Sequence, residues 1–85
     1  MDSQNIYDEL IRIAEKQGFI VMEKRLNPDE MTAGGSYTLR GSNYILLNLS
    51  APLDERVKIL INEIKNGSTE DFYISPIIRK ILLGE

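Results

Sequence analysis

The sequence predicts an α+β fold: an N-terminal helix, a three-stranded antiparallel meander, then one long and one short C-terminal helix. Three observations predict it. Apolar residues recur with helical spacing near both ends of the chain. Runs of β-prone residues separated by turn residues fill the middle. The length of 85 residues suits one small domain, so we expect a single domain over residues 1–85.

An amphipathic helix is predicted from about Ser3 to Gln17, because its apolar residues recur at i, i+3 and i+4 and so share one face. Gly18 follows the last turn, where glycine readily adopts the left-handed conformation that ends a helix. We expect the buried face to consist of Ile6, Tyr7, Leu10, Ile11 and Ala14.

The first strand is predicted over residues 19–26, which begin with Phe-Ile-Val-Met and end before an Asn-Pro-Asp turn signal. A loop over residues 27–35 follows. It ends with the pair Gly34-Gly35 and is longer than the two residues of a tight hairpin turn.

A β-hairpin is predicted next, with strands over residues 36–40 and 44–49 joined by the turn residues Gly-Ser-Asn at 41–43. Side chains alternate between the two faces of a strand, so Tyr37 and Leu39 should share one face. The second strand is strongly apolar, and three of its side chains should share a face. These are Ile45, Leu47 and Leu49.

Two helices are predicted to complete the fold and to pack on one face of the sheet. The long one starts at residues 50–52, with Ser50 as N-cap, and ends at Asn66-Gly67. Its apolar stripe comprises Leu53, Val57, Leu60, Ile61 and Ile64. The short one follows an extended piece at residues 72–74, begins at Ser75-Pro76 and ends before Gly84.

The composition excludes several classes of active site. Cysteine and histidine are both absent, which removes thiol chemistry, the usual general base near neutral pH and the commonest zinc ligands. We therefore expect no metal, no cofactor and no catalytic residue. A formal net charge of −3 with scattered cations argues against a nucleic-acid partner. The polar, acidic start and the lack of a long apolar run predict no secretory signal, no membrane span and a cytoplasmic location.

Polar motifs have both a binding and a structural interpretation. Gly34-Gly35 could hold an anion on backbone N–H groups, or could serve a bulge or a positive φ. Tyr37 and Tyr44 could form an aromatic platform for a base or a sugar, or could simply stabilise the sheet across its strands. We favour the structural interpretation of both. The adjacent acids at 29–30, 54–55 and 70–71 are interpreted as helix-start and loop residues.

The stretch from the third strand into the long helix resembles the core of minimal zinc peptidases of the ImmA/IrrE type. In that family a strand ending in I-x-x-N precedes a helix of the form E-R-x-x-x-x-x-H-E-x-x-H. Here Glu55-Arg56 matches the helix start and Glu63 the general-base glutamate, over about a quarter of the chain. Asn62 and Asn66 stand where the family has its zinc-binding histidines. The resemblance implies a non-catalytic, metal-free relative, because an amide is a poor ligand for zinc.

A second resemblance covers more of the chain and involves a family of small, uncharacterised bacterial proteins. Members share a G-G-x-C/S-x-L/V-R/K-G hairpin, which residues 34–41 resemble except that Tyr37 holds the C/S position, and a Y-L-x-P-x-V/I-R ending, which residues 73–79 resemble with Ile74 in place of leucine. Ser36 and Tyr37 stand near the position where members often have cysteine. This resemblance implies no activity.

Six large aliphatic residues crowd the end of the chain, which is more than one face of a short helix buries. A homodimer could cover the excess, with Ile77, Ile78, Ile81 and Leu82 at its interface. Alternatively all four pack inward and only Leu83 stays exposed. The leading functional hypothesis is a non-enzymatic interaction or regulatory protein. The alternatives are a metal-free hydrolase relative that binds an extended peptide along its sheet edge, and a domain that binds a small ligand or anion.

Overall fold

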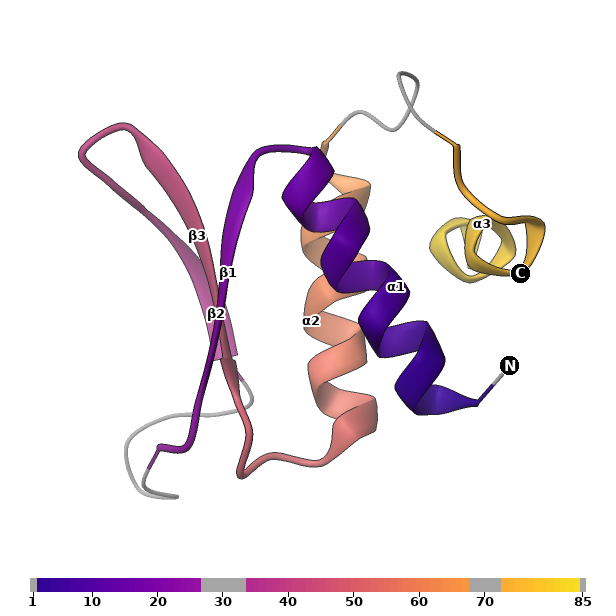
Figure 1. Cartoon of the computed structure of the whole chain (residues 1–85), viewed down its shortest axis with the longest axis horizontal. Coiled ribbons are helices and arrows are strands. Elements are labelled where there is room, and N and C mark those ends of the chain that lie inside the picture. The colour runs from indigo at the N-terminus through magenta and orange to yellow at the C-terminus, as the bar shows by residue number, and fades with distance from the viewer. Residues whose placement is uncertain (1, 27–33, 68–72, 85) are drawn as a thin grey trace.

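The secondary structure follows the predicted order of elements. The computed structural model describes residues 2–26, 34–67 and 73–84 (Figure 1). Its helices and strands are α1 (Ser3–Lys16), β1 (Phe19–Lys24), β2 (Gly34–Leu39), β3 (Ser42–Asn48), α2 (Leu53–Lys65) and α3 (Pro76–Leu83). The α+β class and the placing of one helix before the sheet and two after it are thereby confirmed.

The strand order differs from the predicted meander. β3 lies at the centre of the sheet, with β1 parallel to it on one side and β2 antiparallel to it on the other. The prediction of a purely antiparallel meander is therefore wrong. A two-residue turn forces β2 against β3, whereas nine residues separate β1 from β2 and leave β1 free to pair elsewhere. The most apolar strand takes the position with a partner on each side.

The predicted hairpin is present, with a shifted turn. Arg40 and Gly41 form it, with φ values of 51° and 81°, and positive φ at both positions is typical of a type I′ turn. Ser42 and Asn43, predicted as turn residues, instead begin β3. The predicted loop is also shorter than expected, because Gly34 and Gly35 belong to β2. Its remaining residues, 27–33, lie outside the described part of the chain.

Side-chain capping explains where α1 and α3 begin. The Asp2 carboxylate accepts a hydrogen bond from the Asn5 N–H at the start of α1, and the Ser75 hydroxyl accepts one from the Ile78 N–H at the start of α3. The predicted Ser50 cap of α2 is wrong. Pro52 occupies the N-cap position without a side-chain hydrogen bond, because the chain around Ser50 turns back onto the end of β3.

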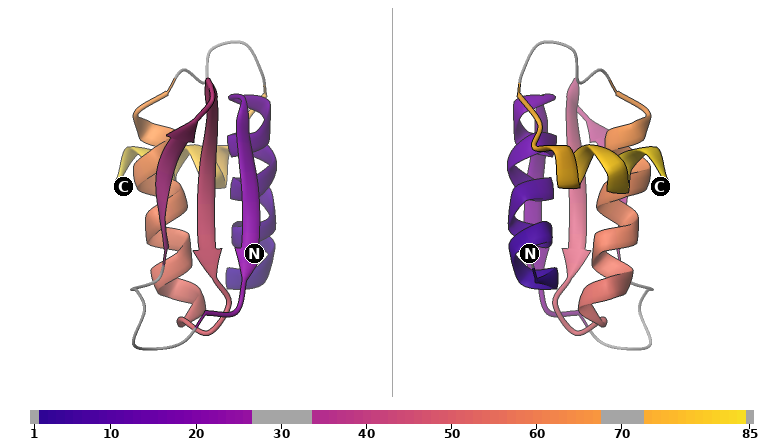
Figure 2. Two further views of the ribbon diagram at one scale, coloured as in Figure 1. Left: turned by 90° about the vertical axis from the view of Figure 1, so that its left-hand side faces the viewer. Right: turned by 90° about the vertical axis from the view of Figure 1, so that its right-hand side faces the viewer.

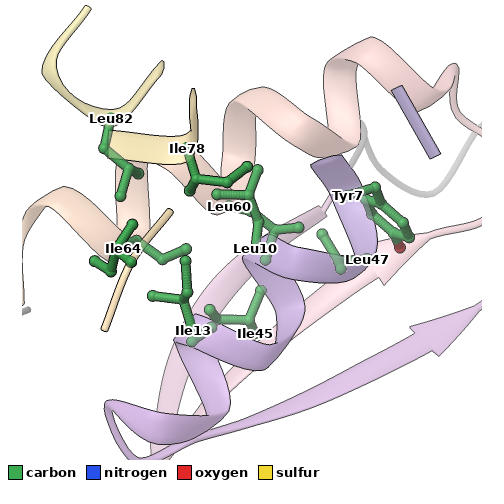
Figure 3. Close-up of a cluster of buried hydrophobic side chains, with 11 residues drawn as sticks. Tyr7, Leu10, Ile13, Ile45, Leu47, Leu60, Ile64, Ile78 and Leu82 are labelled. Atoms are coloured by element: carbon green, nitrogen blue, oxygen red, sulfur yellow. The ribbon is translucent and has the colours of Figure 1, made fainter. Parts of the chain in front are cut away.

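The molecule has three layers (Figures 1 and 2). The sheet forms the first, α1 and α2 lie side by side behind it, and α3 runs across the outer side of both helices. The core lies between these layers (Figure 3). Its buried apolar residues are Tyr7, Leu10, Ile13, Ala14, Ile45, Leu47, Leu60, Ile64, Ile74, Ile78 and Leu82. Helices therefore cover one face of the sheet, as expected, and leave the other open.

Candidate functional site

The uncovered face of the sheet carries a continuous set of apolar side chains. Strand alternation turns Ile45 and Leu47 towards the helices, so their neighbours in β3 point the other way. The registers of β1 and β2 add the residues that lie beside them. We call this surface the open face, and it consists of Ile20, Met22, Tyr37, Leu39, Tyr44 and Leu46. It faces the viewer in the left panel of Figure 2.

Two tyrosines lie side by side on the β2–β3 half of the open face. Tyr37 of β2 lies directly opposite Tyr44 of β3, and their rings stack with centroids 5.1 Å apart and planes 11° apart. Such a pair contributes about 0.2–1 kcal/mol to sheet stability. The sequence predicted that these two residues come together, and the structure confirms their proximity. Tyr37 remains 42% exposed, so its ring is also available for contact.

Charges are arranged unevenly around the open face. Among the described strand residues, Glu23 is the only acid, and it points to the helix side, where its Oε2 accepts a hydrogen bond from the Tyr7 hydroxyl at 2.7 Å. Lys24 ends β1 on the open side, and Arg40 occupies the hairpin turn. These two cations lie at opposite ends of the sheet, because Lys24 aligns with Asn48 while the turn precedes Ser42. The open face is therefore apolar, with a cation at each end.

A polar cluster on the helix side of the sheet links α1, β1 and α2. Tyr7 of α1 is buried, donates to Glu23, and lies under the Arg56 guanidinium, whose carbon is 4.9 Å from the ring centroid. Burial and the hydrogen bond to Glu23 raise the pKa of Tyr7 from 10.0 to about 12, although Arg56 acts in the opposite direction. The phenol is thus held in its neutral form, which stabilises the core and offers no base for catalysis.

Gly34 and Gly35 lie within β2 and not in an anion-binding loop. Gly34 has a φ of 147°, and a Cβ there would collide with the carbonyl oxygen of Leu46. Glycine is therefore required for the close approach of β2 to β3, which supports the conformational interpretation. Gly35 is different, because the space where its side chain would stand is empty.

The residues that resemble a zincin motif lie on the second half of α2. Asn62 is exposed, Glu63 is half-buried, and Asn66 is exposed at the C-cap. Asn62 and Asn66 are one turn apart and share a side of the helix. Within residues 2–26, 34–67 and 73–84, no group of three or more His, Cys, Asp and Glu side chains could hold a metal ion.

The proposed dimer residues on α3 divide between the core and the surface. Ile78 and Leu82 are buried against α1 and α2, and Ile81 is half-buried, so of the four residues only Ile77 is exposed for contact with a second copy. Residues i and i+4 of α3 share its inner face. Ile77 is exposed beside Leu83, which also excludes the alternative in which Leu83 alone stays outside.

Asn48 has a structural role that could not be predicted from the sequence alone. It is the buried polar residue at the end of β3, and its Oδ1 accepts hydrogen bonds from the N–H groups of Leu26 and Ser50 at 3.2 and 2.9 Å. The side chain thereby ties the end of β1 to the turn before α2. Its signal was the asparagine of the I-x-x-N strand ending, a position at which a strand finishes and backbone donors lose their partners.

A shallow pocket of about 210 Å³ lies between the end of α2 and α3. Its described lining is Ile64, Lys65, Gly67, Leu82 and Leu83. It offers a single charged side chain and no convergent set of polar groups, which a ligand site needs to orient its ligand.

Comparison of the chain with protein-family models, with curated proteins and with solved structures found no match. In the described part of the chain, no helix has the length and apolar character needed to cross a membrane.

Proposed function

We propose that this protein is a non-enzymatic interaction protein that holds an amphipathic helix of a partner on its open face. The observation that carries the proposal is the open face itself, a set of six apolar side chains that no helix of the described chain covers. A sheet surface of three strands by six residues spans about 14 by 20 Å, or roughly 300 Å². Apolar patches of this size on a small protein often mark interaction sites.

The dimensions favour a single helix as the occupant. A helix is about 10 Å across and rises 1.5 Å per residue, so roughly 13 residues match the width and length of the open face. Helices already pack on the other side of the same sheet, where Ile45 and Leu47 meet α1 and α2. A partner helix with apolar residues at i, i+3, i+4 and i+7 would repeat this packing on the open side.

The charges favour acidic residues beside the apolar stripe of that helix. Lys24 and Arg40 stand at the two ends of the open face, and the only acid of the described strands, Glu23, points away from it. Carboxylates near both ends of the partner helix would meet these cations. Such contacts mainly determine the orientation and the rate of association, and they weaken with salt.

Capture from native lysate with matched variants tests the site. Leu39→Glu places a negative charge on the open face, the same sign as the carboxylates of the proposed partner helix. Ile77→Glu is the control on α3, since Leu39 and Ile77 are similarly exposed, at 53% and 51%. A partner of the open face is retained by wild type and by Ile77→Glu and is lost with Leu39→Glu. A partner lost with Ile77→Glu and retained with Leu39→Glu would contradict the proposed site.

A designed 14-residue amphipathic peptide tests the proposed chemistry directly. One version carries glutamates beside a leucine stripe, and its control carries lysines at the same positions. In a titration followed by amide chemical shifts, the acidic peptide should move the resonances of Ile20, Met22 and Leu46 and should bind at least several-fold more tightly than the basic one. Equal binding of the two peptides, or shifts confined to α3, would oppose the charge argument.

A further inference from the structure

Among the described strands, β2 lies at an edge of the sheet, and its outer side presents backbone groups without a strand partner. The two-residue turn makes Leu39 and Ser42 a hydrogen-bonded pair, and the pairs then alternate along the ladder. Tyr37 and Gly35 consequently bond to β3, whereas Gly34, Ser36 and Thr38 direct their N–H and C=O groups outwards. Side chains are closer in the non-bonded pairs, and the Thr38 hydroxyl does donate to Asn43 Oδ1 at 2.9 Å.

This edge lacks the features that usually prevent strand addition. Proteins protect edge strands with charges, proline or bulges. The opposite edge, β1, ends in Glu23 and Lys24. β2 has the sequence Gly-Gly-Ser-Tyr-Thr-Leu, without a charge or a proline, and its last four residues are exposed. The two described edge strands therefore differ, because β2 is uncharged along its whole length and β1 is not.

We infer that β2 pairs with β2 of a second copy of this chain, antiparallel and about a two-fold axis at Ser36. This register places Ser36 opposite Ser36 of the partner copy and Thr38 opposite Gly34. All three outward-facing residues of each strand are then paired, which forms about six backbone hydrogen bonds. No charged side chain lies in either strand, so the two copies meet without repulsion.

The side chains of the open face fit the same register. Tyr37 of each copy comes to lie opposite Gly35 of the other, in a non-bonded pair where side chains are close. The space above Gly35 is empty, since a Cβ there would meet no atom within 4 Å. An aromatic ring that covers a glycine across strands is a known means of stabilising a sheet and of fixing its register. The complementarity of these two positions is what favours a second copy over an unrelated peptide.

α2 contacts both β2 and β3 on the covered side of the sheet. The α2 helices of the two copies would therefore lie next to each other on that side of the joined sheet. The dimer would have one six-stranded sheet, and the two open faces would remain exposed on the same side. Self-pairing is thus independent of the partner helix proposed above.

Light scattering after size exclusion, at tens of micromolar, provides the first test. We expect twice the chain mass of 9.7 kDa for wild type and for Ser36→Ala. Ser36→Pro removes an outward N–H while leaving the β2–β3 hydrogen bonds intact, and it should yield a monomer with unchanged circular dichroism. A wild-type mass near 9.7 kDa, or a dimer that persists in Ser36→Pro, would overturn the inference.

Single cysteines test the register independently of stability, because the chain contains no other thiol. In Ser36→Cys the two Cα atoms are about 5.5 Å apart, within the range of a disulfide. In Thr38→Cys they are offset by four residues, about 13 Å, and cannot be bridged. Mild oxidation should therefore cross-link Ser36→Cys at least tenfold faster than Thr38→Cys. Equal rates would mean random collision and would overturn the proposed dimer. Leu39→Glu, which tests the partner helix, leaves this backbone edge unchanged.

Discussion

Replacement of Tyr7 by phenylalanine should destabilise the protein at pH 8 and have little effect on its stability near pH 11. At pH 8 the variant loses the 2.7 Å hydrogen bond that the Tyr7 hydroxyl donates to Glu23. Because Glu23 is exposed, water can solvate its carboxylate instead. We therefore expect a cost of about 1 kcal/mol, in the middle of the range for a single hydrogen bond. The ring itself stays buried, so the core packing is retained.

The pH dependence follows from the raised pKa of Tyr7, about 12 in the folded state against 10.0 when unperturbed. The unfolded chain loses the phenol proton first. The stability that Tyr7 contributes is therefore complete below pH 10 and is lost as the pH rises towards 12. At a pH one unit above the unfolded value, the loss is about 1.4 kcal/mol. Wild type and Tyr7→Phe should accordingly be equally stable near pH 11.

Urea unfolding at pH 8 and pH 11, monitored by circular dichroism, measures this change. The difference between the two proteins cancels the titration of all other groups, which they share. Tyr73→Phe, at an exposed ring, is the matched control and should retain the wild-type pH dependence. A free-energy difference between wild type and Tyr7→Phe that is the same at both pH values would show that Tyr7 does not titrate abnormally.

Three further predictions concern the core, the turn and metal binding. Leu60→Ala should lower the free energy of unfolding by about 2–5 kcal/mol, because the side chain is fully buried. Lys58→Ala, on the exposed side of α2, should lower it by less than about 0.5 kcal/mol. Equal denaturant midpoints for the two variants would contradict the assigned helix face. Arg40→Asn should stabilise the hairpin by about 0.5–1 kcal/mol, and Gly41→Ala should destabilise it by about 1 kcal/mol, since both positions have positive φ. Changes of the opposite sign in thermal unfolding would exclude the type I′ turn. Equimolar zinc should leave the melting temperature unchanged, because the chain has no His or Cys, and a chelator-reversible rise of several degrees would disprove this.

Part of the candidate site could be predicted from the sequence. The pairing of Tyr37 with Tyr44 follows from the hairpin, because a short turn leaves few possible registers. The sequence also predicts that one face of the sheet stays uncovered, because the predicted helices suffice to cover only one face. The contribution of Ile20 and Met22 could not be predicted, because it depends on β1 lying parallel to β3. Nothing in the local sequence of β1 selects the strand it pairs with. The predicted meander placed β2 beside β1, whereas the structure places β3 there.

Features that depend on residues a few positions apart could be predicted before the fold was known. The bounds of α1 and α3 follow from apolar periodicity and from the capping residues Gly18, Ser75 and Gly84, whose energetics are local. Contacts between residues far apart in the chain became known only from the packing of the elements. Tyr7 meets Glu23 across 16 positions and Asn48 meets Leu26 across 22. The packing also decided that Ile78 is buried and Ile77 exposed. The physical reason is that a side chain's partner across the core depends on how whole elements pack, and many packings satisfy the same local pattern.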